Sequence, residues 1–256
     1  MTDNSQSKDN DKQNLFILSR SALLRGLCYL IPVPFLDDFI AQRVLKNMVT
    51  SLLNDHGRSF PDKRVAVLYE GESKGCLAKI WSFAVGLIIK PLKKLFKTFF
   101  FVLAIRDVAL GIGSTLFLGR CLNRSLNQQA LGNEDASKAE ADPTSLEAQS
   151  LQIFQAYKTS YKGSDKKVIL QTLQAFLKQL KGLGSWGVSA VKTLFGKKQE
   201  SYDGVEALPE GEQVKVVKAV HGLTELMQQE EFAKILTNFD TDFDACLAKT
   251  REGSAS

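Results

Sequence analysis

Histidine and cysteine are scarce in this sequence, which limits the chemistry that its side chains offer. The 256 residues include two histidines and four cysteines, and the cysteines stand far apart, at Cys28, Cys76, Cys121 and Cys246. No pair of cysteines has the spacing of a zinc site or a redox dithiol, and four scattered cysteines exclude the disulfide scaffold of a small secreted domain. We therefore expect no metal site, no cofactor and a reducing compartment.

Proline is also rare, and its placement predicts long helices. The six prolines leave long intervals free of the strongest helix breaker; they are Pro32, Pro34, Pro61, Pro91, Pro143 and Pro209. Hydrophobic residues make up 44% of the chain and charged residues 24%, a balance that excludes a wholly disordered protein. Apolar residues recur at helical spacing through most of these intervals, so the sequence predicts an all-α protein.

A long uncharged hydrophobic run is missing as well. The longest stretch without a charged residue is Val108–Gly119, which has 12 residues, whereas a plain transmembrane helix needs about 20 apolar residues. Residues 1–14 are polar and include acids, so they predict a disordered tail and not an export signal. We expect no ordinary membrane span.

Charge is distributed unevenly along the chain. Residues 15–124 have a net charge of +9, whereas residues 1–14 have −1 and residues 125–256 have −3. A basic, apolar first half joined to a mildly acidic second half favours contact between the first half and an anionic surface. A solvated basic domain is the alternative interpretation.

The pattern divides into two parts at a polar stretch near residue 130. We expect a disordered tail at 1–14, an apolar basic helical module at 15–128, a linker at 129–141, a second helical module at 142–250 and a short tail at 251–256. The predicted fold is therefore a two-part multi-helix bundle with an apolar basic N-terminal half.

Individual helices are placed by apolar spacing and by their breakers. In the first module we expect helices near 15–31, 34–57, 77–90 and 92–125, and Gly57 is expected to end the second of them. Residues 64–69 fit either a short strand or a helical turn. In the second module the expected helices lie near 144–161, 169–180, 216–227, 230–237 and 241–250, and residues 183–196 are a short glycine-rich amphipathic segment.

A glycine-rich stretch after residue 110 lacks the pattern of a nucleotide loop. Gly111, Gly113 and Gly119 suggest a dinucleotide fingerprint, but Leu116 occupies the third required glycine position and no strand precedes it. Ala109 and Gly113, one turn apart, instead predict that another helix approaches closely here.

Three alternating acids near the C-terminus do not form a calcium loop. Asp240, Asp242 and Asp244 have the right spacing, but Ala245 and Arg251 stand where the loop needs glycine and glutamate. Helix capping by Asp240 or Asp242 is the better explanation of these acids.

Charges inside apolar segments suggest a buried ion pair. Asp37 and Asp38 follow IPVP, in a position that suits the positive end of a helix dipole. The functional alternative is that one of them pairs with Arg106, for which Asp107 is a further candidate partner. An isolated guanidinium in so apolar a segment would be costly, so we expect Arg106 to be charge-paired.

The strongest physical signal is a lysine-rich helix face that begins at residue 90. Lysines spaced by three, one and three residues share one face of a helix, and large apolar residues occupy the opposite face. The eight residues are Lys90, Lys93, Lys94 and Lys97 on the basic face and Leu92, Leu95, Phe96 and Phe99 on the apolar face. Such a cationic amphipathic face can lie on an anionic bilayer, and a solvated lysine face on a core helix is the alternative.

Insertion of residues 98–119 into a bilayer is finely balanced. Its apolar residues contribute roughly −4 to −7 kcal/mol, whereas Arg106 and Asp107 near its centre cost about +5 to +7 kcal/mol. A helix that is buried in protein or lies at the interface is favoured, and insertion stays open.

Several segments together resemble a bacterial helical family. They are IPVPFLDDFI, KPLKKLFKTFFFVLAIRD and EFAKILTNFDTDFDACLA, and the sequence is also similar to EcsC-type proteins. The resemblance implies a bacterial, helical, membrane-proximal protein, and it brings no catalytic residues.

These observations favour a non-enzymatic protein that associates peripherally with the cytoplasmic face of an inner membrane and acts through lipid and protein contacts. A soluble helical scaffold or adaptor that binds an acidic protein is the second hypothesis. The third is an enzyme that uses Asp37 or Asp38 with His56. Nucleic-acid binding is disfavoured, because Phe and Leu back the basic face in place of residues suited to bases and phosphates.

Overall fold

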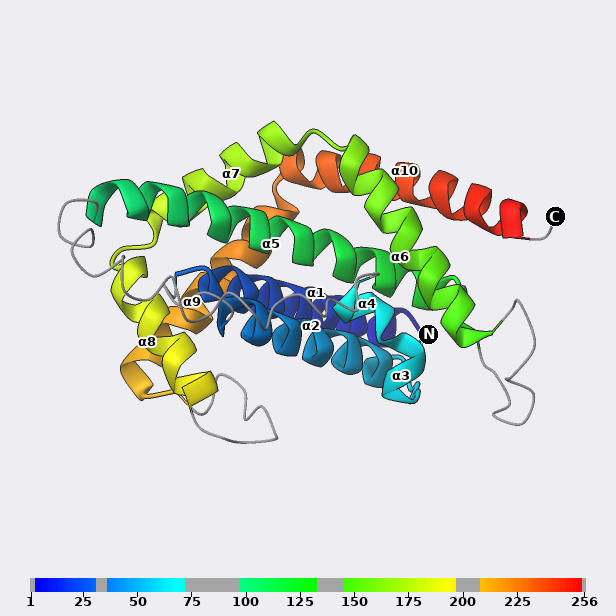
Figure 1. Ribbon diagram of the computed structural model, residues 1–256, viewed down its shortest axis with the longest axis horizontal. Coiled ribbons are helices and arrows are strands. Elements are labelled where there is room, and N and C mark those ends of the chain that lie inside the picture. The colour runs from blue at the N-terminus through cyan, green and yellow to red at the C-terminus, as the bar shows by residue number, and fades with distance from the viewer. Residues whose placement is uncertain (1–2, 31–35, 72–96, 133–144, 197–207, 255–256) are drawn as a thin grey trace, which may run out of the picture.

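The computed structural model describes residues 3–30, 36–71, 97–132, 145–196 and 208–254, and every regular element in these ranges is an α-helix (Figure 1). The all-α prediction is confirmed. The helices are α1 (Asp3–Cys28), α2 (Leu36–Asp55), α3 (Asp62–Val65), α4 (Val67–Glu70), α5 (Lys97–Asn127), α6 (Leu146–Gly163), α7 (Lys166–Gln179), α8 (Leu183–Gly196), α9 (Glu210–Gln228) and α10 (Glu230–Ser254).

The long helix α5 is the centre of the bundle. In Figure 1 it lies between α1 and α2 on one side and α7 and α10 on the other, and α6 crosses it. It packs against α1, α2, α6, α7 and α10, while α10 packs along α6, and α8 and α9 pack on α1. Segments far apart in the sequence therefore meet on α5 and α1.

The helices on either side of the expected linker share one hydrophobic core. Buried residues of α1, α2 and α5 belong to the same cluster as buried residues of α6 to α10. Two buried aromatic side chains join α5 to α10, since the rings of Phe117 and Phe239 meet edge to face with centroids 4.4 Å apart. Most of the expected linker lies outside the described residues.

Glycines let α1 and α5 approach closely. A Cβ added at Gly26 would lie 2.8 Å from the carbonyl oxygen of Val108, and one added at Gly111 would lie 2.6 Å from the Tyr29 ring. The sequence predicts that another helix approaches this glycine-rich stretch closely, but it places the contact at Ala109 and Gly113. Gly111 has this role against α1, while a Cβ at Gly113 would make ordinary contacts with the α7 side chains Ile169 and Leu173.

Arg25 adds polar contacts at the same crossing of α1 and α5. Its Nη1 donates to Ser114 Oγ at 2.6 Å and to Thr115 Oγ1 at 3.1 Å. Both acceptors belong to α5, so this guanidinium joins the two central helices through neutral oxygens.

Two helices end in the same hydrogen-bonding motif. After α2, Gly57 has φ = +66°, and Arg58 N–H donates to Leu53 C=O at 2.8 Å. This confirms the predicted stop at Gly57, because such a reversal requires left-handed backbone. After α5, Gln129 takes the same position with φ = +54°.

The chain ends are more helical than expected. α1 begins at Asp3, within the expected tail at 1–14, and Asn14 is buried. The polar residues 3–14 include no proline or glycine, so they continue the helix that the apolar residues after them anchor. At the other end α10 is one helix from 230 to 254, which corrects the two short helices and the tail at 251–256.

Residues 64–69 fall in α3 and α4, so the helical-turn alternative is the right one. The helix expected near 77–90 lies outside the described residues.

Candidate functional site

The predicted membrane-binding face lies mostly outside the described residues. This holds for Lys90, Leu92, Lys93, Lys94, Leu95 and Phe96. Lys97 and Phe99 lie in the first turn of α5, where the backbone is described and the side chains are not. The face therefore stays a sequence prediction that leads directly into a described helix.

The helix that follows this face is buried in protein. Most of its apolar side chains from residue 105 onward belong to the hydrophobic core; they are Ile105, Val108, Ala109, Ile112, Leu116, Phe117, Leu118, Cys121, Leu122 and Leu126. Among the described helices, none has the length and apolarity that are needed to cross a bilayer. Of the alternatives for residues 98–119, the part from residue 105 onward is buried in protein.

Arg106 and Asp107 do not form the buried ion pair that we expected. Both residues are exposed, although they stand between apolar neighbours in the sequence. Because α5 buries only the side of the helix that faces its partners, these two residues reach water and need no partner. The predicted burial of Arg106 and Asp107 is wrong.

Asp37, Asp38 and His56 lie too far apart to act together. Both aspartates are in the first turn of α2, as the dipole argument predicted, and their side chains are not described. His56 follows the last turn of this 20-residue helix, which is about 30 Å long at 1.5 Å per residue. His56 Nε2 lies 2.8 Å from Asn123 Oδ1, at the end of α2 opposite the two aspartates, so one chain does not bring these acids and His56 into a single site.

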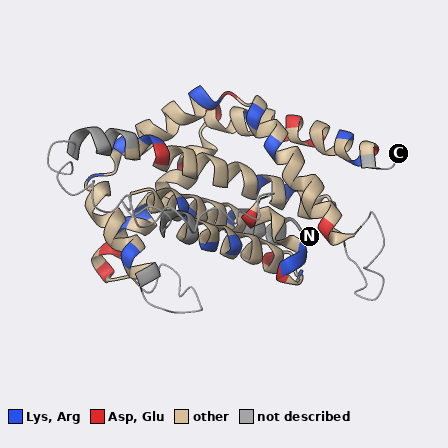
Figure 2. Cartoon of the chain, in the orientation of Figure 1, with Lys and Arg blue, Asp and Glu red and all other residues tan. Residues whose placement is uncertain are grey.

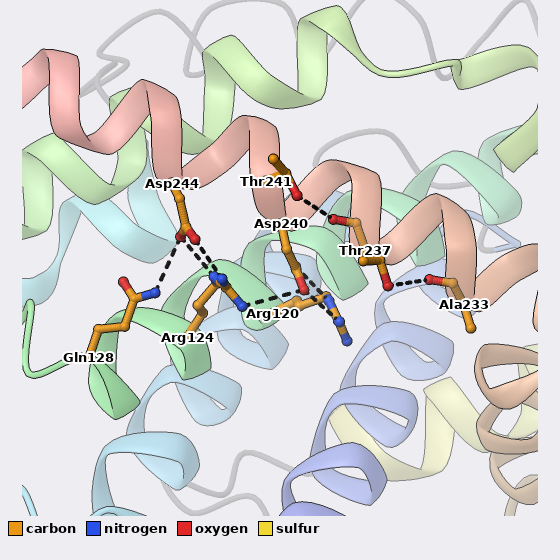
Figure 3. A network of polar contacts seen from close by, with 8 residues as sticks. All are labelled: Arg120, Arg124, Gln128, Ala233, Thr237, Asp240, Thr241 and Asp244. Atoms are coloured by element: carbon orange, nitrogen blue, oxygen red, sulfur yellow. Dashed lines mark hydrogen bonds and ion pairs between the residues drawn. The ribbon is translucent and has the colours of Figure 1, made fainter.

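A network of charged side chains that the sequence interpretation missed joins α5 to α10 (Figure 3). Arg120 donates from Nε to Asp240 Oδ1 at 2.7 Å and from Nη2 to Oδ2 at 2.6 Å. One turn later, Arg124 makes the same two-pronged contact with Asp244, and its Nη1 lies 3.7 Å from Asp240 Oδ2. The Asp240 side chain is 11% exposed, so the pair of Arg120 and Asp240 is more strongly shielded from water than the pair of Arg124 and Asp244.

The network changes the acid–base properties of its members. The hydrogen bond from Arg124 holds the pKa of Asp244 below its usual range, and Asp244 in turn raises the pKa of Arg124. Cys121 lies between the two arginines in sequence and is fully buried, and burial raises the pKa of its thiol. That thiol therefore stays protonated and is a poor nucleophile at neutral pH.

The sequence does carry a signal for this network. Arg120 and Arg124 are four residues apart, and so are Asp240 and Asp244, so each pair lies on one face of its helix with matching separation. The two sets are distant in sequence, and only the packing of α10 on α5 brings them together. The expected capping role of Asp240 and Asp242 is wrong, because both lie inside α10.

The described residues contain no group of three or more His, Cys, Asp or Glu side chains placed to hold a metal ion. The cysteines among them, Cys28, Cys121 and Cys246, are free thiols.

Comparison with known proteins gives no relative: no family model, no curated protein and no solved structure matches this chain.

Proposed function

We propose that the protein associates peripherally with anionic membrane surfaces through residues 90–99 and acts there by lipid and protein contacts, without catalysis. The observation that carries the proposal is the burial of α5, most of whose apolar side chains from Ile105 onward belong to the protein core. Those side chains can reach hydrocarbon only if the core opens. We therefore assign contact with the bilayer surface to the cationic amphipathic segment that precedes the buried part of α5.

The charges on the described surface favour binding of an anionic membrane through one local basic segment over attraction by the protein as a whole. Figure 2 shows basic and acidic residues interspersed along the described helices. Four lysines within eight residues, from Lys90 to Lys97, are a denser positive charge than this mixture. Each lysine near an anionic bilayer contributes about 1 kcal/mol.

We propose the cytoplasmic face of a bacterial inner membrane as the location. Scattered cysteines fit a reducing compartment, and the EcsC-type resemblance implies a bacterial membrane-proximal protein.

The test is binding of the full chain to vesicles of phosphatidylglycerol and phosphatidylcholine, compared with pure phosphatidylcholine vesicles. We expect stronger binding to the anionic vesicles and weaker binding as salt rises. Changing Lys90, Lys93, Lys94 and Lys97 to Gln should weaken binding at low salt on the order of 100-fold or more, because four surface charges are removed.

A matched variant separates the local site from net charge. Lys215, Lys218, Lys234 and Lys249 are exposed on α9 and α10, and changing them to Gln lowers the net charge by the same amount, from +5 to +1. This control should retain most of the binding. Equal binding by the first variant and the unmodified chain, with unchanged helical content, would overturn the proposal and favour an acidic protein as the partner.

A further inference from the structure

A cavity of about 480 Å³ lies between α1 and α2, away from the α5–α10 network and from the proposed membrane segment. Its volume is in the range of small-molecule sites. The lining residues recur about once per helical turn, on α1 from Gln13 to Leu24 and on α2 from Val44 to Asp55. Such spacing places each set on one face of its helix.

The two walls of the cavity run antiparallel. Gln13 Nε2, early in α1, donates to Asp55 Oδ1, at the end of α2, at 2.7 Å. Arg20 and Asn47 are seven and eight residues away from that contact on their helices, which corresponds to about 10–12 Å at 1.5 Å per residue. The cavity therefore has a carboxylate at one end and a guanidinium further along.

Asn47 and Arg20 bring nitrogen-bearing side chains to the two walls of the cavity. The Nδ2 atom of Asn47 is itself buried from water, so the donors that a ligand in the cavity can reach are those of Arg20. The guanidinium of Arg20 has five N–H donors, so it can serve a ligand in addition to its protein contact.

The remaining lining suits hydroxyl groups. Ser21, Ser51 and Asn54 each donate and accept hydrogen bonds, and Asp55 accepts them. Ile17, Leu24 and Val44 add apolar wall, which suits the carbon skeleton of a polar molecule.

We propose that this cavity binds a small phosphorylated polyol. The phosphate oxygens accept from the Arg20 guanidinium, since a guanidinium binds oxyanions with paired hydrogen bonds, and Asn47 lines the wall across from it on α2. The hydroxyls reach toward Ser51, Asn54 and Asp55, and the anion is held about 10 Å from the Asp55 carboxylate, where repulsion is weak. The site is independent of residues 90–99.

The test measures binding of glucose 6-phosphate, glucose and inorganic phosphate to the full chain by calorimetry. We expect glucose 6-phosphate to bind most tightly, because it alone satisfies both ends of the cavity. Arg20→Gln and Asn47→Asp should each weaken its binding roughly tenfold or more, the first by removing a positive charge and the second by adding a negative one. Lys218→Gln, which removes a positive charge from exposed α9, should leave the affinity within about twofold.

Asn47→Asp keeps the size of the side chain, so it carries the test if Arg20→Gln fails to fold. Thermal melting without ligand checks the folding of both variants.

Phosphatidylinositol vesicles, compared with phosphatidylglycerol vesicles of equal charge, test a lipid headgroup as the source of the same chemistry. If the chain prefers phosphatidylinositol and Asn47→Asp abolishes that preference, the result supports binding in the cavity and identifies a lipid headgroup as the ligand. Three results would overturn the proposal: inorganic phosphate binding as tightly as glucose 6-phosphate, unchanged binding in both variants, or no binding to any of these probes.

Discussion

At the scale of single residues, the two arginines Arg106 and Arg120 show what sequence context can and cannot tell. Both stand among apolar residues of α5, yet Arg106 is exposed and Arg120 pairs with Asp240. An apolar neighbourhood in sequence describes all sides of a helix together, whereas burial applies to one side. The sequence interpretation thus wrongly predicted that Arg106 is buried, and it missed the paired arginine of the same helix, Arg120.

Asp240→Asn tests the shielded pair. The change leaves Arg120 without its anionic partner in a largely buried position, so we expect a loss of about 1.5–3 kcal/mol in the free energy of unfolding. Asp242→Asn, at an exposed position on the same helix, should change it by less than about 0.5 kcal/mol. Urea denaturation measures both, and equal effects of the two substitutions would argue against the pair.

Gly26→Ala tests the close crossing of α1 and α5. The added methyl group would meet the backbone oxygen of Val108, which cannot move out of the way without separating the helices. We expect a loss of about 1–3 kcal/mol. Gly211→Ala in α9, where nothing lies within 4 Å of the added Cβ, should be neutral or stabilising by up to about 1 kcal/mol. If thermal melts show Gly26→Ala to be as well tolerated as Gly211→Ala, the crossing is looser than described.

At the scale of elements, helical periodicity and breakers predicted most of the described helices. Gly57 ends α2 in the left-handed conformation that the sequence indicated. Ser145 and Asp165, which the sequence interpretation did not name as caps, cap the starts of α6 and α7 with their side chains. The exceptions are the polar start of α1 and the unbroken α10. The polar start of α1 has the composition of a disordered tail, and the aspartates of α10 have the spacing of helix caps. Neither segment contains a residue that stops a helix.

The docking of α10 on α5 should weaken in acid. Because Arg124 lowers the pKa of Asp244, the pair stabilises the fold above the ordinary pKa of aspartate, about 3.9. That stabilisation is lost as pH falls through the lowered pKa. Asn at position 244 does not titrate, so the stability difference between the unmodified chain and Asp244→Asn should shrink from pH 5 to pH 2. A difference that stays constant across this range would contradict the pKa direction.

At the scale of the whole molecule, the two expected modules meet in one hydrophobic core. Composition predicted a boundary near residue 130, because the chain becomes polar there, but composition does not say whether the helices on either side pack together. They do so through α1, α5 and α10. Which faces pack together depends on contacts more than 100 residues apart, such as Arg120 with Asp240.

A shared core predicts that both modules unfold together. In a Trp81→Phe variant, Trp186 of α8 alone reports the second module by fluorescence, while circular dichroism reports all helices. We expect the two thermal transitions to coincide. A fluorescence transition well separated from the loss of helix would indicate two independently stable modules.

The central claim is that a membrane meets residues 90–99 while α5 keeps its place in the protein core. Hydrogen–deuterium exchange of the full chain, with and without phosphatidylglycerol vesicles, tests it most directly. We predict that amides of residues 90–99 gain protection on vesicle binding and that amides from Ile105 to Leu126 keep the protection they have in solution. Loss of protection in the helices that cover α5, together with vesicle binding, would mean that the core opens and α5 inserts, and would contradict the account.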